Sequence, residues 1–171
     1  TVGHTAHRQS AARIARQALR VERQTGEARW PVAPSAAGRL FVAHLGADPS
    51  IPTTLERGVR SAYDDVTIVS LGADISPETQ ERVREAARHA DHVLVAAVAE
   101  PAAWTAFGLS ADQTALIQGL SEAQPVALAA LGSPLVLEAA PTAAVHLCTY
   151  SSVPDAHRAL VGWMTGDLPA E

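Results

Sequence analysis

Glu100 and Trp104 are the residues of this sequence whose types and spacing are best suited to act on a ligand. They lie four positions apart, directly after the apolar run 92–98. A carboxylate can transfer a proton, and an aromatic ring can pack against the face of a sugar. We therefore take Glu100 as the candidate catalytic residue and Trp104 as the candidate substrate-binding residue. The alternative is that Glu100 is a solvent-exposed residue at a helix start, where a negative charge is favourable.

Other catalytic arrangements are not supported by the sequence. Hydrolysis of a glycosidic bond needs two carboxylates held at a defined separation, and we find no convincing pair. Asp64 and Asp65 are adjacent, but they lie before an apolar run, whereas a site is expected after one. There is no GxSxG motif, no GxGxxG motif and no lysine, which excludes a nucleophile elbow, a dinucleotide fingerprint, a P-loop and a Schiff base. We expect no cofactor.

Histidine and cysteine do not indicate a metal site. The seven histidines include no HExxH motif and no close partner with ligand spacing. Cys148 is the only cysteine, so neither an intrachain disulfide nor a thiolate cluster can form. Because Cys148, His44 and His146 all lie in apolar runs, we expect them to be buried core residues.

Charge and hydropathy exclude two classes of partner. The formal net charge is −5, whereas nucleic-acid binding needs clustered basic residues. The apolar runs are much shorter than the about 20 residues of a transmembrane helix, and the first residues lack the apolar core of a signal peptide. We expect a soluble protein, cytoplasmic or secreted, with the compartment left open. The one basic concentration has helical spacing and is interpreted as a solvated helix face: Arg8, Arg13, Arg16, Arg20 and Arg23.

The elements that would position these residues alternate along the chain. Short apolar runs without strict alternation are typical of strands buried on both faces of a parallel sheet. The runs are residues 40–45, 66–71, 92–98, 125–131 and 144–149. Segments with helical period lie between them, so we predict a doubly wound α/β fold: a mostly parallel sheet of five to six strands with helices on both faces.

Helix starts and the less regular segments complete the prediction. Thr53 with Glu56 and Ser110 with Gln113 have capping-box spacing, and Ser76 precedes a proline at a first helical position. A helix is predicted over residues 5–22, an extended connector over 26–38, and only a short helical turn between the last two strands. We expect one structural domain overall, with an N-terminal helix and connector (1–38) followed by an α/β sandwich (39–171).

The segment from Pro125 to Pro169 resembles the C-terminal domain of family 3 glycoside hydrolases. Such domains carry a strand, a GSP turn, a short apolar helix with a proline, a strand ending in TY-S, and a helix followed by G-D/E-x-P. The resemblance covers most of the chain, more weakly before residue 90. The matching positions are Gly132, Ser133, Pro134, Pro141, Thr149, Tyr150, Ser151, Pro154, Gly166 and Pro169.

The resemblance implies a parent enzyme whose nucleophile lies on a preceding (β/α)₈ barrel, which this chain lacks. In the β-glucosidase branch, a Glu from a long loop after the third strand completes the site, and Glu100 stands in the corresponding region. Here that loop is short and lacks the Tyr-x-Glu continuation, which favours the β-N-acetylhexosaminidase-like branch, where this domain is not catalytic.

The resemblance thus implies a non-catalytic domain of a glycosidase acting on β-linked N-acetylglucosamine or glucose. Its partner would be the barrel, with carbohydrate as a candidate ligand, and the isolated chain would be inactive. The alternative is a stand-alone α/β binding or oligomerisation module. A domain that docks on a barrel should expose an apolar patch, whereas an independent module should not. A third hypothesis, a Rossmann-type nucleotide-dependent enzyme, would share the fold, but this sequence lacks the glycines of its nucleotide-binding motif.

Overall fold

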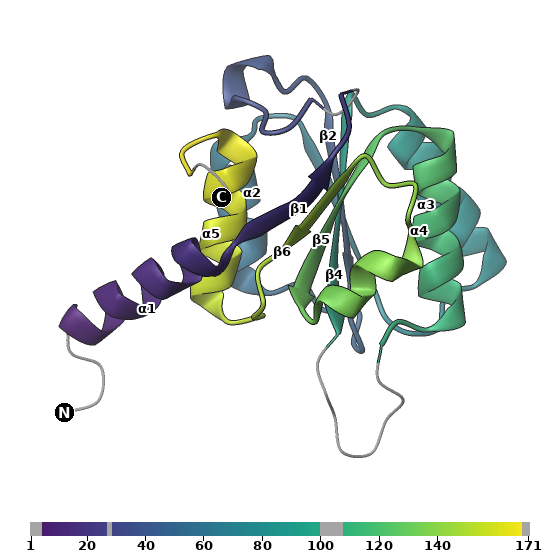
Figure 1. Cartoon of the computed structure of the whole chain (residues 1–171). Coiled ribbons are helices and arrows are strands. Elements are labelled where there is room, and N and C mark those ends of the chain that lie inside the picture. Colours follow the sequence, from purple (N-terminus) through teal and green to yellow (C-terminus); the bar gives the residue numbers. More distant parts are fainter. Residues whose placement is uncertain (1–4, 27–28, 100–107, 169–171) are drawn as a thin grey trace.

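The computed structural model describes residues 5–26, 29–99 and 108–168. They form one six-stranded sheet in the order β1-β6-β5-β4-β2-β3 (Figure 1). The five strands β2 to β6 are parallel to one another, and β1 pairs antiparallel with β6 at one edge. The strands are β1 (Arg20–Gln24), β2 (Leu40–Leu45), β3 (Val66–Leu71), β4 (His92–Ala99), β5 (Val126–Gly132) and β6 (Val145–Cys148).

Helices cover both faces of this sheet, so the predicted doubly wound α/β class is confirmed (Figure 1). One face carries α2 and α5, with α1 against α5, and the other carries α3, α4 and the 3₁₀ helix η2. A further 3₁₀ helix, η1 (Pro34–Ala36), lies in the connector before β2. The bounds are α1 (Thr5–Ala18), α2 (Thr53–Ala62), α3 (Pro77–Arg88), α4 (Ala111–Ala123), η2 (Pro134–Ala139) and α5 (Pro154–Thr165).

Successive residues of a central strand belong to two different cores because side chains alternate across the sheet. In β2, Leu40 and Val42 pack with α2 and α5. Phe41 and Ala43 pack with α3 and α4. All six residues of β2 are buried, which explains why the sequence shows a continuous apolar run there.

The predicted strands match closely because their apolar runs are local signals. The bounds of β2 and β3 are as predicted, and β4 extends one residue further. β5 begins and ends one residue later than predicted, and β6 is shorter at both ends. The capping box of Ser110 and Gln113 is present in full, and the Ser76 side chain accepts from the backbone N–H of Thr79. The capping box at Thr53 is wrong. Thr53 is already the first helical residue, and Pro52 holds the cap position without a side-chain hydrogen bond.

The predicted helix over residues 5–22 is also wrong at its C-terminal end. The helix α1 ends at Ala18, and the chain then forms β1 along the open edge of β6, with Arg20 opposite Cys148 and Gln24 opposite Val145. Arg20 and Arg23 therefore do not belong to the predicted helix face. The physical reason is tertiary: β6 offers unpaired backbone groups, and pairing with them stabilises a strand that local periodicity does not indicate.

Candidate functional site

Ligands of doubly wound sheets bind where the parallel strands end, which we call the carboxyl edge. This edge carries the loops after β2, β3, β4, β5 and β6. The candidate residues Glu100 and Trp104 belong to the loop after β4 but lie outside the described residues. Their roles therefore stay predictions, and the described geometry of the edge comes from the residues around them.

Gln113 ties together three loops of the carboxyl edge. Its Nε2 donates to the backbone oxygens of Gly46 at 2.8 Å and Gly72 at 3.0 Å, in the loops after β2 and β3. Its Oε1 accepts from the backbone N–H of Ser110, and the Ser110 hydroxyl donates to the oxygen of Ala73. The sequence predicted Gln113 only as a capping residue, because no local pattern reveals hydrogen bonds to loops about 40 and 70 residues away.

Two buried histidines lie beneath the same edge. His44, on β2, is 3% exposed and its Nδ1 shares a 2.9 Å hydrogen bond with the Ser70 hydroxyl of β3. His157, on the first turns of α5, is 2% exposed. Within the described residues, Nε2 of His44 and both ring nitrogens of His157 have no hydrogen-bond partner. The expectation that His44 is a core residue is confirmed.

Burial decides the charge of this histidine pair. It lowers the pKa of His44 to about 4, and the nearby positive charge of a protonated His157 lowers it further. Burial also lowers the pKa of His157, with a smaller contribution from the Arg158 guanidinium. Both imidazoles are therefore neutral at pH 7, and a charge on either would be opposed by desolvation.

The other candidates for reactive groups have structural roles. Burial raises the pKa of the Cys148 thiol, which donates to the backbone oxygen of Gly132 at 3.8 Å. His146 is buried on β6, and its Nε2 lies 2.9 Å from the oxygen of Ala140. Among residues 5–26, 29–99 and 108–168, no three histidine, cysteine or carboxylate side chains gather as metal ligands would. Asp64 and Asp65 precede β3, at the opposite edge.

Apolar side chains are exposed at the carboxyl edge. Leu135 follows β5, Tyr150 and Val153 follow β6, and each keeps about half of its surface exposed. Tyr150 has a positive φ of 55°, which non-glycine residues rarely adopt. Its hydroxyl donates to the Glu22 carboxylate of β1 at 2.8 Å. We call Leu135, Tyr150 and Val153 the carboxyl-edge patch.

The motif that carries the family resemblance builds these loops. Gly132 ends β5 with a φ of 110°, a conformation that favours glycine. Ser133 caps η2 by accepting from the backbone N–H of Leu135, and Pro134 takes the first helical position. Gly166 ends α5 in the left-handed conformation. These residues therefore position the ends of β5 and the helices on either side of β6.

Comparisons with known proteins agree with the resemblance. No family model and no curated protein matches the chain. Among solved structures, it superimposes on a family 3 β-N-acetylglucosaminidase from Paenibacillus sp. str. FPU-7 with a TM-score of 0.79 and 23% identity. That match covers 99% of this chain and 32% of the enzyme. This chain has the fold of a part of a family 3 glycoside hydrolase.

Two further structures share that fold. A β-glucosidase from Listeria innocua in complex with isofagomine gives a TM-score of 0.78 at 17% identity, covering 97% of this chain and 26% of the enzyme. A fungal multi-domain family 3 β-N-acetylglucosaminidase gives a TM-score of 0.72 at 17% identity. That match covers 98% of this chain and 19% of the enzyme. The chain therefore spans about a third or less of the length of the family 3 enzymes it matches. In the part of the chain that the structure describes, no helix has the length and apolarity to span a membrane.

Proposed function

We propose that this chain is the C-terminal, non-catalytic α/β domain of a glycoside hydrolase acting on β-linked N-acetylglucosamine or glucose. The catalytic barrel would be supplied by residues outside this sequence. The observation that carries the proposal is coverage: 99% of this chain matches only 32% of a family 3 β-N-acetylglucosaminidase. A fold that nearly fills the chain but forms a minor part of the enzyme is what a flanking domain would produce.

The described residues support a non-catalytic role. Two carboxylates at the starts of carboxyl-edge helices are already engaged. Asp112 accepts from the backbone N–H of Ile75 at 3.0 Å, and Asp155 pairs with Arg158 at 2.7 Å. A glycosidase needs two carboxyl groups facing one glycosidic bond, and carboxylates held by structural partners are poorly placed for that task.

The carboxyl-edge patch supports docking on another domain. Leu135, Tyr150 and Val153 expose apolar surface on loops at the same edge of the sheet, and a docked partner would cover such surface. The positive φ of Tyr150 is a backbone cost that a role in docking would explain. A stand-alone module has no need of such a patch, so we do not favour that alternative. We propose that the barrel covers Leu135, Tyr150 and Val153.

In the sequence, Glu100 follows β4 directly and Trp104 lies four residues later. We propose that they lie where the barrel docks, with Trp104 a candidate sugar contact and Glu100 a weaker candidate for chemistry. The short loop favours the N-acetylglucosaminidase branch, in which the barrel supplies both catalytic groups.

The test is an activity assay on two proteins. The pure chain should not hydrolyse aryl N-acetylglucosaminide or aryl glucoside, and the protein encoded by the complete reading frame should hydrolyse one of them. Turnover by the pure chain would contradict the proposal, as would a complete reading frame without a barrel. In the complete protein, Glu100→Gln should lower kcat/KM less than about tenfold, because loss of a general acid or base costs about 10²–10⁴-fold.

A further inference from the structure

The two outer strands of the sheet, β1 and β3, differ in how they are protected from pairing with another chain. β1 carries the charges of Arg20, Glu22 and Arg23, and its pairing with β6 shifts register between Val21 and Arg23. Charges and irregular pairing are devices that keep outer strands from associating. β3 has the sequence VTIVSL, without a charged residue or a proline, and its register with β2 is regular throughout. β3 therefore lacks the protection that β1 has.

The backbone groups that β3 leaves open follow from its hydrogen bonds to β2. The N–H of Leu40 donates to the oxygen of Asp65 at 2.9 Å, and the N–H of Gly46 donates to the oxygen of Leu71 at 3.1 Å. In a parallel pair the groups that point to the same neighbour recur at every second residue. The odd-numbered residues of β3 therefore face β2, and the even-numbered residues direct their N–H and C=O groups outwards. These even-numbered residues are Val66, Ile68 and Ser70.

The side chains beside these open groups are accessible and mostly apolar. Val66 and Ile68 pack partly against the core that includes α2 and α5, and Val69 and Leu71 pack partly against the core of α3 and α4. Thr67 is exposed. Among the described residues, no strand pairs with β3 on its outer side. A further strand would complete the hydrogen bonding there and would cover apolar surface on both faces of the sheet.

We propose that β3 pairs antiparallel with β3 of a second copy of this chain, so that two sheets join across a two-fold axis beside Ile68. Ile68 would face Ile68 of the second copy, and Val66 would face Ser70 of that copy. Residues that face each other in this way in an antiparallel pair exchange both of their N–H···O=C bonds. All the open backbone groups of β3 would then be hydrogen-bonded.

The occupant is a second copy because the open groups of β3 are complementary to themselves. They lie at Ile68 and two residues to either side of it, so the pattern is unchanged when the strand is reversed. A contact across a two-fold axis requires such self-complementarity. An axis perpendicular to the sheet also keeps each face on its own side, so the apolar row that contains Val66 and Ile68 would continue from one copy into the other.

Charges on α2 are arranged in the same self-complementary way. Gly58 of α2 lies against the Val161 side chain of α5, which follows β6 on the far side of the sheet from β3. Glu56 and Arg60 are two residues to either side of Gly58, which places both about 200° around the helix, on the side towards β3. They form an ion pair with an Nε–Oε1 distance of 3.1 Å. The two-fold axis would bring each of them towards the opposite charge of the second copy.

This contact is compatible with a docked barrel. The carboxyl-edge patch lies on the loops after β5 and β6, and two strands, β4 and β2, separate β5 from β3 in the sheet. Pairing through β3 therefore leaves Leu135, Tyr150 and Val153 uncovered. The inference goes beyond the proposed hydrolase role and does not rest on it.

Sedimentation equilibrium of the chain between about 1 and 500 µM tests the proposal. We expect a monomer–dimer equilibrium with a Kd on the order of 10 µM, because one short strand pair makes a small interface. Thr67→Lys adds a charge at the exposed position of β3 and should raise the Kd at least about tenfold. The matched control is Thr142→Lys, at an exposed position before β6, which should dimerise as the parent does.

Cysteine cross-linking tests the register. Thr67 of one copy would face Val69 of the other, in the closely spaced type of antiparallel pair with Cα atoms about 4.5 Å apart, which a disulfide can bridge. Two copies of Thr67 would lie diagonally, at about 7–8 Å. On mild oxidation, a mixture of the Thr67→Cys and Val69→Cys variants should therefore give a disulfide-linked dimer in at least about fivefold excess over either variant alone.

Three results would overturn the proposal. The first is a chain that stays monomeric at about 500 µM, well above the expected Kd. The second is a dimer that Thr67→Lys weakens no more than Thr142→Lys does, which would place the contact elsewhere on the molecule. The third is equal cross-linking in the mixture and in the single variants, which would exclude the proposed register. None of these results involves the barrel, so they leave the proposed hydrolase role untouched.

Discussion

The carboxyl edge and the amino edge of the sheet differ in which groups are hydrogen-bonded and which are exposed. At the carboxyl edge, the Gln113 amide donates hydrogen bonds to neighbouring loops, and apolar side chains such as Leu135 are exposed. At the amino edge, where the parallel strands begin, Trp30 is buried against Trp163, and Nε2 of Gln124 has no hydrogen-bond partner among the residues that the structure describes. The two edges of one sheet therefore present different kinds of surface.

The largest expected effect on stability comes from removing the stacking of Trp163 on Trp30 at the amino edge. Trp163→Ala should lower the free energy of unfolding by about 3–5 kcal/mol, because a buried aromatic side chain leaves a cavity. Urea denaturation followed by circular dichroism measures this. Ile14→Ala, on the exposed side of α1, is the control and should change it by less than about 0.5 kcal/mol. Equal effects in the two variants would mean that the stacked tryptophan pair is not part of the stable core.

The histidines beneath the carboxyl edge should make stability depend on pH. His44 has a pKa of about 4 in the folded chain against an ordinary value of 6.5, so the unfolded chain takes up the proton first. The contribution of His44 is complete above pH 6.5 and is lost as the pH falls towards 4, at up to about 1.4 kcal/mol per pH unit. Urea unfolding at pH 7, 6 and 5 measures it.

His157→Leu separates this pair from other acid-sensitive groups. Both ring nitrogens of His157 lack partners among the described residues, so an apolar side chain of similar size should leave stability at pH 7 unchanged or raised. The fall in stability between pH 7 and 5 should become shallower. An unchanged slope in His157→Leu would show that His157 does not contribute to acid sensitivity.

Gln113→Glu should lower the free energy of unfolding by at least about 1–3 kcal/mol, because it leaves two carbonyls without a donor and places a buried carboxylate oxygen against them. Glutamate keeps the oxygen that accepts from Ser110, so the capping box survives and the loss reports on the loops after β2 and β3. Gln118→Glu is the matched control, since that amide bonds Ala139 at an exposed position. Thermal unfolding of both variants measures the difference, and an equal loss in both would contradict a special role for Gln113.

The smallest expected effect on stability comes from the carboxyl-edge patch. Leu135→Ser and Val153→Ala should each change the free energy of unfolding by less than about 0.5 kcal/mol, because both side chains are exposed and neither change adds or removes a helix cap. Binding of a hydrophobic dye should nevertheless fall, and association with a separately produced barrel should weaken. A loss above about 1 kcal/mol would show that the patch belongs to the core of this domain.

Local signals in the sequence determined the parallel part of the fold. The bounds of β2 and β3 were predicted because a strand buried on both faces must be apolar at successive positions. The Ser110 cap was predicted because its partners lie within one helical turn. The same argument failed at Thr53, since Pro52 already occupied the cap position.

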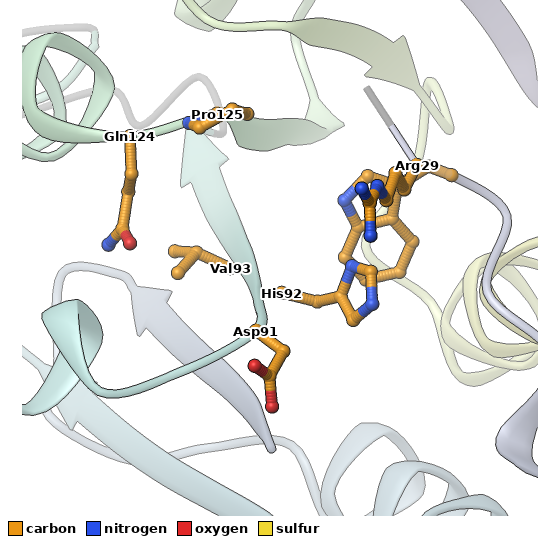
Figure 2. Close-up of a pocket in the computed structure, with 7 residues that line it drawn as sticks. Arg29, Asp91, His92, Val93, Gln124 and Pro125 are labelled. Carbon is orange, nitrogen blue, oxygen red and sulfur yellow. The ribbon is translucent and has the colours of Figure 1, made fainter. Parts of the chain in front are cut away.

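Tertiary structure alone decided β1 and the cavity at the amino edge, where the parallel strands begin. Residues 20–22 continue a helical pattern, but the open edge of β6 offers backbone partners that convert them to a strand. That cavity (Figure 2) is lined by Arg29, His92 and Gln124, which are about 30 to 95 residues apart in the sequence and share no motif. Glu100 and Trp104 stay predictions from sequence. Periodicity and caps act within a few residues, whereas a site requires the packing that brings distant segments together.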